Sequence, residues 1–171
     1  GRAAFVDTGT SHSVPGLLQA MADRGISPEQ VDYVFVTHVH LDHAGGAGAL
    51  MQALPKAIAV VHPRGARHLA EPEKLIAGTR AVYGDEAFER MYGDIIPIPA
   101  ERIHVPEDGE TLELAGRPLR VMFTEGHARH HYCLADPEGS GVFTGDSFGI
   151  KERSIRRFSS CTSNSIFCCL F

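Results

Sequence analysis

The sequence predicts an α/β (α+β) fold, on three observations. Short apolar runs, such as those at 34–36 and 57–61, have the length and composition of buried strands. Segments with apolar residues at helical spacing, such as 14–21, lie between these runs. Glycines and prolines separate the segments. Strands and helices that alternate in this way are typical of an α/β arrangement.

In the first half of the chain, strands are predicted at 3–7, 34–36 and 57–61, and helices at 13–21, 46–54 and 63–70. Ser13 is suited to cap the first helix, because a hydroxyl accepts hydrogen bonds from free backbone N–H groups. Ser27 and Gln30 form a capping-box pattern around Pro28, which predicts a short helical turn before the strand at 34–36.

In the second half, the stretch from 73 to 92 has a helical pattern interrupted by glycines, and 73–98 is a candidate substrate wall, with a packed helix pair as the alternative. Ile95–Pro99 is excluded as a central strand, because its two prolines cannot donate to a sheet. Strands are predicted at 102–105, 111–114, 119–124, 132–135 and 141–144, with turns at 108–109, 115–116 and 137–140.

The composition is that of a globular domain. The chain has 171 residues, of which 43% are hydrophobic and 22% charged, and this length allows a sizeable core. A net charge of −5 argues against nucleic-acid binding. No apolar run is long enough to cross a bilayer and no secretory signal is visible, so we expect a cytoplasmic protein with a small-molecule substrate. Because residue 1 is glycine and not methionine, the natural N-terminus is expected to lie upstream.

The most informative segment is 37–43, which reads Thr-His-Val-His-Leu-Asp-His. Four potential metal ligands lie within six positions, directly after the predicted strand at 34–36. Apolar packing does not explain four such side chains so close together. Metal binding does, because neutral imidazole nitrogens and carboxylate oxygens bind zinc, iron and manganese. Successive side chains of a tight loop point in different directions, so one loop can serve two ions. The segment therefore predicts a metal centre.

With three further motifs, this segment resembles the metallo-β-lactamase superfamily, which includes glyoxalase II and several lactonases. Residues 6–9, Val-Asp-Thr-Gly, are similar to the family's early Asp-x-Gly. Residues 124–127, Thr-Glu-Gly-His, resemble its Thr-Pro-Gly-His, with Glu125 where proline is usual. Residues 143–146, Phe-Thr-Gly-Asp, resemble its strand-end Gly-Asp. The motifs occur in the family's order.

The resemblance implies a four-layer αβ/βα sandwich, in which two sheets pack face to face with helices outside. It also implies that the sandwich is incomplete. The chain starts at a strand that the family reaches after an opening hairpin, and it ends shortly after the last motif. A sandwich truncated at both ends would expose unpaired strand edges and apolar surface.

The resemblance also implies two metal positions. The first would be held by His38, His40 and His127. The second would be held by Asp42 and His43, with Asp146 as a bridge between the two. The family completes the second position with a downstream histidine, but none follows His131 here. One or two zinc ions are therefore expected, with iron or manganese as the alternative metals.

The remaining polar residues near the motifs are assigned other roles. His131 is expected to orient a metal ligand without binding the ion. His130 is equally a pocket residue or an exposed one. Asp7 is expected to accept backbone N–H groups of the segment 37–43, here called the metal loop, and so to brace it. The histidines outside the motifs are expected to be surface or packing residues: His12, His62, His68 and His104.

The expected activity is hydrolysis. A divalent ion lowers the pKa of bound water from ~15.7 towards ~7, so a metal-bound hydroxide can attack an ester, thioester, lactone or related bond. Asp42 is predicted to be catalytic, because its carboxylate can orient this nucleophile or accept its proton. Two alternatives stay open. One is a mononuclear iron dioxygenase of the persulfide type, with ligands His38, His127 and Asp146. The other is a truncated, inactive remnant that binds metal.

Two segments of unequal character are predicted, a partial metallo-β-lactamase-like domain at 1–150 and an atypical tail at 151–171. The tail changes from basic to serine-rich to apolar and holds Cys161, Cys168 and Cys169, which are expected to be reduced thiols. So abrupt a shift predicts a disordered or non-native segment, such as the product of a frameshift. Residues 168–171 also fit a prenylation pattern.

Overall fold

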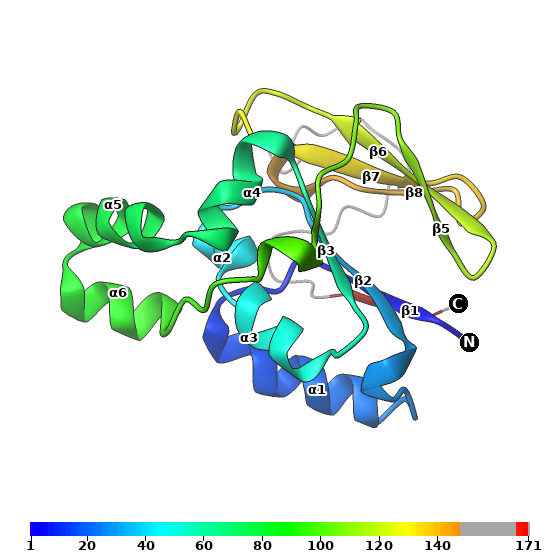
Figure 1. The fold of residues 1–171 in the computed structure, drawn as a ribbon, viewed down its shortest axis with the longest axis horizontal. Helices are drawn as coiled ribbons and strands as arrows, with labels where there is room; N and C mark the ends of the chain where they lie inside the picture. Colours follow the sequence, from blue (N-terminus) through cyan, green and yellow to red (C-terminus); the bar gives the residue numbers. More distant parts are fainter. Residues whose placement is uncertain (148–166, 171) are drawn as a thin grey trace, which may run out of the picture.

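The computed structural model describes residues 1–147 and 167–170, and it confirms the predicted fold class. Two sheets pack face to face, and helices cover the outer face of the first sheet (Figure 1). Three of the four expected layers are thus present. Within the described residues, no helix layer covers the outer face of the second sheet.

The first sheet has the strand order β4-β3-β2-β1-β9. Its parallel strands are β1 (Ala3–Val6), β2 (Val31–Val36), β3 (Ile58–Val61) and β4 (Ile103–His104). The helices between them are α1 (Val14–Ala22), α2 (Leu41–Ala44), α3 (Ala47–Ala53) and α4 (Pro63–Ala70). Because both faces of this sheet are covered, its strands are near-continuous apolar runs instead of alternating patterns.

The second sheet is an antiparallel meander with the order β5-β6-β7-β8. Its strands are β5 (Thr111–Leu114), β6 (Arg117–Phe123), β7 (Tyr132–Asp136) and β8 (Gly141–Phe143). β6 begins two residues before the predicted strand. The reason is the two-residue turn at Ala115 and Gly116, where positive φ angles of 54° and 85° allow Leu114 to pair directly with Arg117.

Short 3₁₀ turns occur at η1 (Ser11–Ser13), η2 (Pro28–Gln30), η3 (Ala100–Arg102) and η4 (Gly145–Ser147). The predicted capping box is present at η2, where the Ser27 N–H donates to Gln30 Oε1 at 2.8 Å. Ser13 lies at the N-cap of α1 as expected, but its hydroxyl makes no capping hydrogen bond. Instead, the Ser13 N–H donates to Thr10 O at 3.0 Å, which closes η1.

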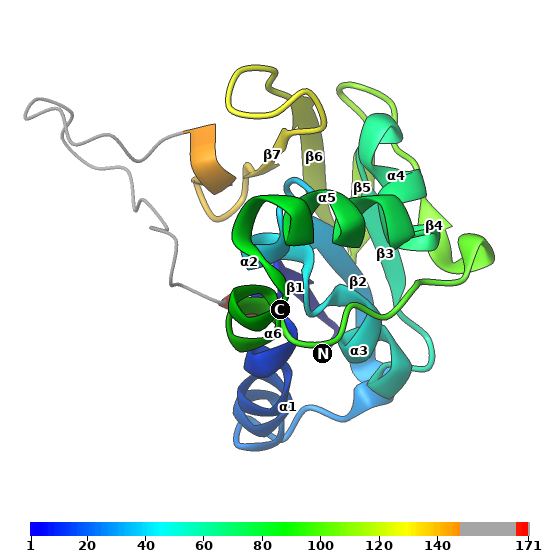
Figure 2. The same cartoon turned by 90° about the vertical axis from the view of Figure 1, so that its left-hand side faces the viewer.

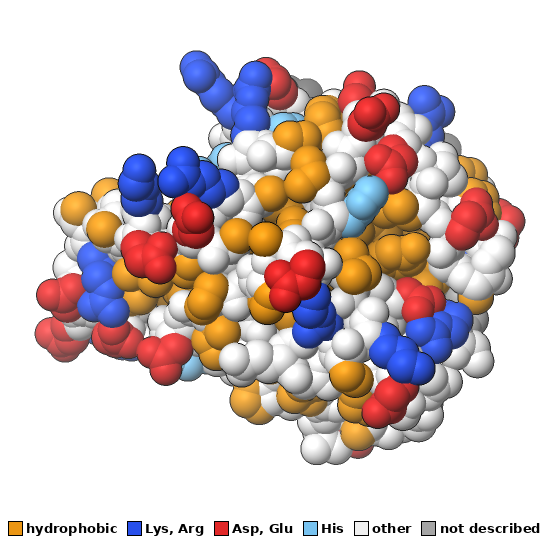
Figure 3. Space-filling model, in the orientation of Figure 1, with side chains coloured by type: hydrophobic (Ala, Val, Ile, Leu, Met, Phe, Trp, Pro, Cys, Tyr) orange, Lys and Arg blue, Asp and Glu red, His pale blue; other side chains and the backbone are white. Residues whose placement is uncertain are grey.

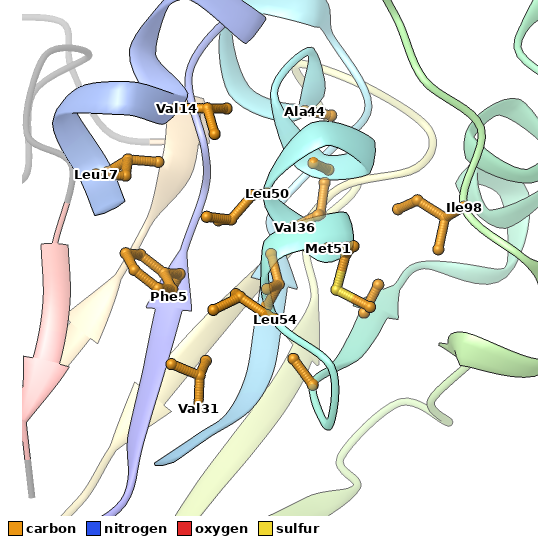
Figure 4. Packing of buried hydrophobic residues seen from close by; sticks show 14 of the residues in the cluster. Phe5, Val14, Leu17, Val31, Val36, Ala44, Leu50, Met51, Leu54 and Ile98 are labelled. Atoms are coloured by element: carbon orange, nitrogen blue, oxygen red, sulfur yellow. The ribbon is translucent and has the colours of Figure 1, made fainter. Parts of the chain in front are cut away.

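Successive side chains of β1 point to opposite faces of the first sheet and so belong to two separate core clusters. Phe5 points to the helices, where Leu50 of α3 and Leu54, directly after it, pack over β1 and β2 (Figure 4). Ala4 and Val6 point to the second sheet and pack against residues such as Val121 and Leu134. The two sheets are therefore held together by apolar packing along the whole of β1.

The predicted segment 73–92 forms two helices, α5 (Glu73–Tyr83) and α6 (Asp85–Tyr92), which meet at Gly84. Phe88 and Tyr92 of α6 pack on Leu41 of α2, so the hairpin lies beside α2 (Figure 2). The rest of the hairpin projects from the molecule, and its surface mixes hydrophobic with acidic and basic side chains (Figure 1 and Figure 3). Val82 is among its exposed hydrophobic residues. Among the described helices, none has the length and apolar character needed to cross a membrane.

The tail predicted at 151–171 falls mostly on residues 148–166 and 171, which lie outside the described residues together with Cys161 and the end of the prenylation pattern. The backbone of β9 (Phe167–Leu170) pairs antiparallel with β1. The division of the chain at residue 150 stays a prediction.

Candidate metal centre

Four segments with the predicted ligands and braces meet at one end of the two sheets. Asp7 follows β1, residues 37–43 follow β2, residues 124–131 connect β6 to β7, and Asp146 follows β8. The carboxyl ends of the parallel strands share one edge of the first sheet, which brings the first two segments together. The second sheet is fixed to this edge by the Tyr132 N–H, which donates to Thr37 O at 2.9 Å.

The first group of candidate ligands is His38, His40 and His127, whose ligand atoms all lie within 4.8 Å of one another. His40 Nδ1 lies 3.0 Å from His127 Nε2. His38 is fully buried, whereas His40 and His127 face solvent. This group therefore has a buried base and an open side from which a substrate can approach.

The second group is His38, His43 and Asp146. Asp146 Oδ1 lies 3.2 Å from His43 Nε2, and its other oxygen, Oδ2, lies 3.5 Å from His127 Nε2. Asp146 thus reaches both groups, one oxygen towards each. His38 belongs to both groups, a position that the sequence did not predict.

Asp42, which was expected in the second group, lies beside it. Asp42 Oδ2 is 3.8 Å from His43 Nε2, and 61% of the Asp42 side chain is exposed. The segment expected to be a loop is here the helical turn α2, and neighbouring residues of a helix do not face the same side. His43 consequently points into the site, while Asp42 points to its solvent side.

These residues fit a divalent metal ion. Among the described residues, four buried imidazole nitrogens have no hydrogen-bond partner, although buried polar atoms nearly always have one: Nε2 of His38, His43, His62 and His131. Those of His38 and His43 belong to the ligand groups. Two ligands of a tetrahedral zinc ion, each about 2.1 Å from it, lie about 3.4 Å apart. The separations of 3.0, 3.2 and 3.5 Å between the donor atoms here are close to that value.

The lowered pKa values of His38 and His40 suit metal binding, whereas the raised pKa of His43 favours its protonated ring. Burial, followed by the nearby imidazoles, lowers the pKa of His38 and of His40, so both rings keep a free lone pair at neutral pH. Burial alone would also lower the pKa of His43. The hydrogen bond to Asp7 and the charges of Asp7, Asp42 and Asp146 outweigh it, and the pKa of His43 is raised.

Asp7 braces the site as expected. Its Oδ1 accepts the Thr37 N–H at 2.8 Å, and its Oδ2 lies 2.8 Å from His43 Nδ1. The His43 carbonyl in turn accepts the Thr8 N–H at 2.7 Å. With Nδ1 of His43 directed to a carboxylate, its Nε2 is left to face Asp146.

His131 is buried behind the candidate ligands. Its Nδ1 lies 2.7 Å from Thr124 Oγ1 and 3.2 Å from Ser147 Oγ, and burial lowers its pKa to about 4. The neighbouring Gly145 has a φ of 48°, and a Cβ there would lie 2.7 Å from His131 Nε2. Only glycine fits, which explains why glycine precedes Asp146.

The histidines outside the motifs belong to neither group of described ligands. His62 is buried and caps α4 by accepting the Arg64 N–H, and His104 pairs with Glu110 at 2.7 Å. His12 and His68 also lie apart from the two groups. His130 differs from these, because its Nδ1 accepts the Val39 N–H in the middle of the metal loop. The sequence had left His130 open between a pocket residue and an exposed one, and here it is half-buried against this segment.

The family model of the metallo-β-lactamase superfamily matches residues 1–161. The chain belongs to this superfamily. A metallo-β-lactamase fold-containing protein of Sulfurisphaera tokodaii is 31% identical over 77% of the chain. The crystal structure of an archaeal superfamily protein from Sulfolobus tokodaii superposes with a TM-score of 0.67 and 28% identity, covering 89% of this chain and 56% of that one.

Two further superfamily relatives have names that state a reaction. A hydroxyacylglutathione hydrolase of Synechococcus is 30% identical over 85% of the chain, and an atrochrysone carboxyl ACP thioesterase of Aspergillus fumigatus is 27% identical over 69% of it. The chain spans 53% of the Sulfurisphaera protein, 43% of the Synechococcus enzyme and 28% of the Aspergillus enzyme. The matches thus concern about half of each relative or less.

Proposed function

We propose that this chain is a metal-dependent hydrolase that cleaves a thioester of a small molecule. The observation that carries the proposal is the position of Asp146, whose two oxygens reach His43 and His127 and so join the two groups of ligands. One or two divalent ions, zinc first, would be held by His38, His40, His43, His127 and Asp146. Such an ion supplies a hydroxide nucleophile at neutral pH and polarises the scissile carbonyl.

The choice of a thioester is supported by the relatives. One is named as a hydrolase of an acylated glutathione and the other as a thioesterase. The α5–α6 hairpin is proposed as a wall for the acyl group, because Phe88 and Tyr92 attach it to α2, which carries Asp42 and His43. Its exposed Tyr83 and Met91 offer apolar surface to a substrate.

Asp42 is proposed as the proton acceptor. Its carboxylate lies on the solvent side of His43, where it can take the proton that the attacking water loses. Asp42→Asn is expected to lower kcat by about 100-fold, since a positioned general base contributes at least that much. Steady-state kinetics measure this. The control is Asp94→Asn, which removes an exposed carboxylate outside both ligand groups. Equal kcat values for the two variants would exclude this role.

The proposed function is tested with a hydroxyacyl thioester of glutathione, by following the free thiol that hydrolysis releases. We expect turnover that a chelator abolishes and that added zinc restores. Oxygen uptake with a persulfide and ferrous iron would replace the hydrolase with the dioxygenase alternative. A chain that binds no metal after loading would be the inactive remnant. Turnover that persists in metal-free protein would refute the proposal.

A further inference from the structure

The backbone around His38 is held on both sides. The Thr37 N–H, before His38, donates to Asp7 at 2.8 Å. The Val39 N–H, after His38, donates to His130 Nδ1 at 3.3 Å. Val39 is buried, with 1% of its surface exposed, so its N–H has no access to bulk water. An acceptor from another segment is therefore needed at this point, and the β6–β7 connection provides it.

The His130 ring also lies against the side chains of the candidate ligands. It is nearly parallel to the His38 ring, with 12° between the planes and 6.3 Å between the centroids, and it meets the His40 ring edge-on at 5.5 Å. As the acceptor of the Val39 N–H, Nδ1 carries no hydrogen, which leaves Nε2 as the ring's donor. Neither candidate ligand group includes His130.

We propose that His130 is a positioning residue, which accepts the Val39 N–H and thereby fixes the directions in which His38 and His40 project. Val39 is the residue between these two candidate ligands, and rotation of its peptide group would turn both imidazoles. Because His130 lies in the connection between β6 and β7 of the second sheet, the position of that sheet affects the geometry of the first ligand group. The inference rests on the metal centre of the proposed function and not on its substrate.

Three variants of the full chain separate acceptor chemistry from packing. In His130→Asn, the side-chain oxygen takes the place of Nδ1. In His130→Gln, the oxygen is displaced towards the position of Nε2, and in His130→Phe the ring remains without an acceptor. Each is loaded with Co²⁺, and affinity is measured by competition with a chelator alongside the visible spectrum of the bound ion. His104→Asn is the matched control, because His104 pairs with Glu110 and belongs to neither ligand group.

We expect His130→Gln and His130→Phe to bind Co²⁺ about 10- to 100-fold more weakly and with an altered visible spectrum. His130→Asn should stay within about 3-fold of the parent and keep its spectrum, as should His104→Asn. Parent-like affinity in the Gln variant, or equal losses in the Asn and Gln variants, would overturn the proposal, and these two remain comparable even where the Phe variant does not fold. A parent chain that binds Co²⁺ without hydrolysing thioesters would refute only the proposed function. One that binds no Co²⁺ would refute both.

Discussion

Replacing His38 with alanine is expected to leave the purified chain without bound metal. His38 is the residue that both ligand groups share, so its loss reduces each group from three ligands to two. Zinc sites in proteins hold at least three protein ligands, and about one to two ions per chain are therefore expected to fall to nearly none. Elemental mass spectrometry of the purified protein measures the metal content. His127→Ala should act in the same direction on the first group.

The matched control is His62→Ala. His62 is buried, with 3% of its surface exposed against 0% for His38, and it also has an unpartnered Nε2, but it belongs to neither ligand group. Its loss removes a helix cap, so it should cost about 1 kcal/mol of stability while leaving the metal content unchanged. His12→Ala is a second control at an exposed position. Full metal content in His38→Ala would contradict the assignment of both groups.

Local sequence patterns predicted most strands and helices, because strands and helices each place their apolar residues at a characteristic spacing in the sequence. The run at 57–61 appears as β3 and the run at 34–36 as the end of β2. Such patterns do not encode which strands pair. That β1 and β2 are neighbours, and that Tyr132 joins the second sheet to Thr37, depends on contacts between segments distant in the chain.

The candidate site was predictable to the extent that its ligands are neighbours in the sequence. His38, His40 and His43 follow one strand, and their spacing alone indicated a metal centre. His127 and Asp146 were accessible only through the family resemblance, because nothing local distinguishes them. The helical turn α2 was missed, since the four residues 41–44 are too short for a helical period to show. That turn is what directs Asp42 and His43 to different sides.

Replacing Asp7 with alanine is expected to lower both stability and metal affinity. Asp7 has a φ of 57°, a conformation that alanine adopts at a cost of about 1 kcal/mol. The Thr37 N–H and its hydroxyl would also lose their acceptor, and an unmade buried hydrogen bond costs about 2 kcal/mol. The sum of about 3 kcal/mol corresponds to a Tm about 10 °C lower, which thermal unfolding of the metal-free chain measures.

Asp7→Asn separates these two effects. Asparagine tolerates the positive φ, and its side-chain oxygen can still accept the Thr37 N–H, so most of the stability should remain. Its amide nitrogen cannot accept from His43 Nδ1, which leaves the imidazole unoriented, and metal affinity should fall by about 10- to 100-fold. Chelator competition measures this loss. If Asp7→Asn bound metal as tightly as the parent, Asp7 would act on the site through the Thr37 backbone alone, and the Asp7–His43 contact would have no part in metal binding.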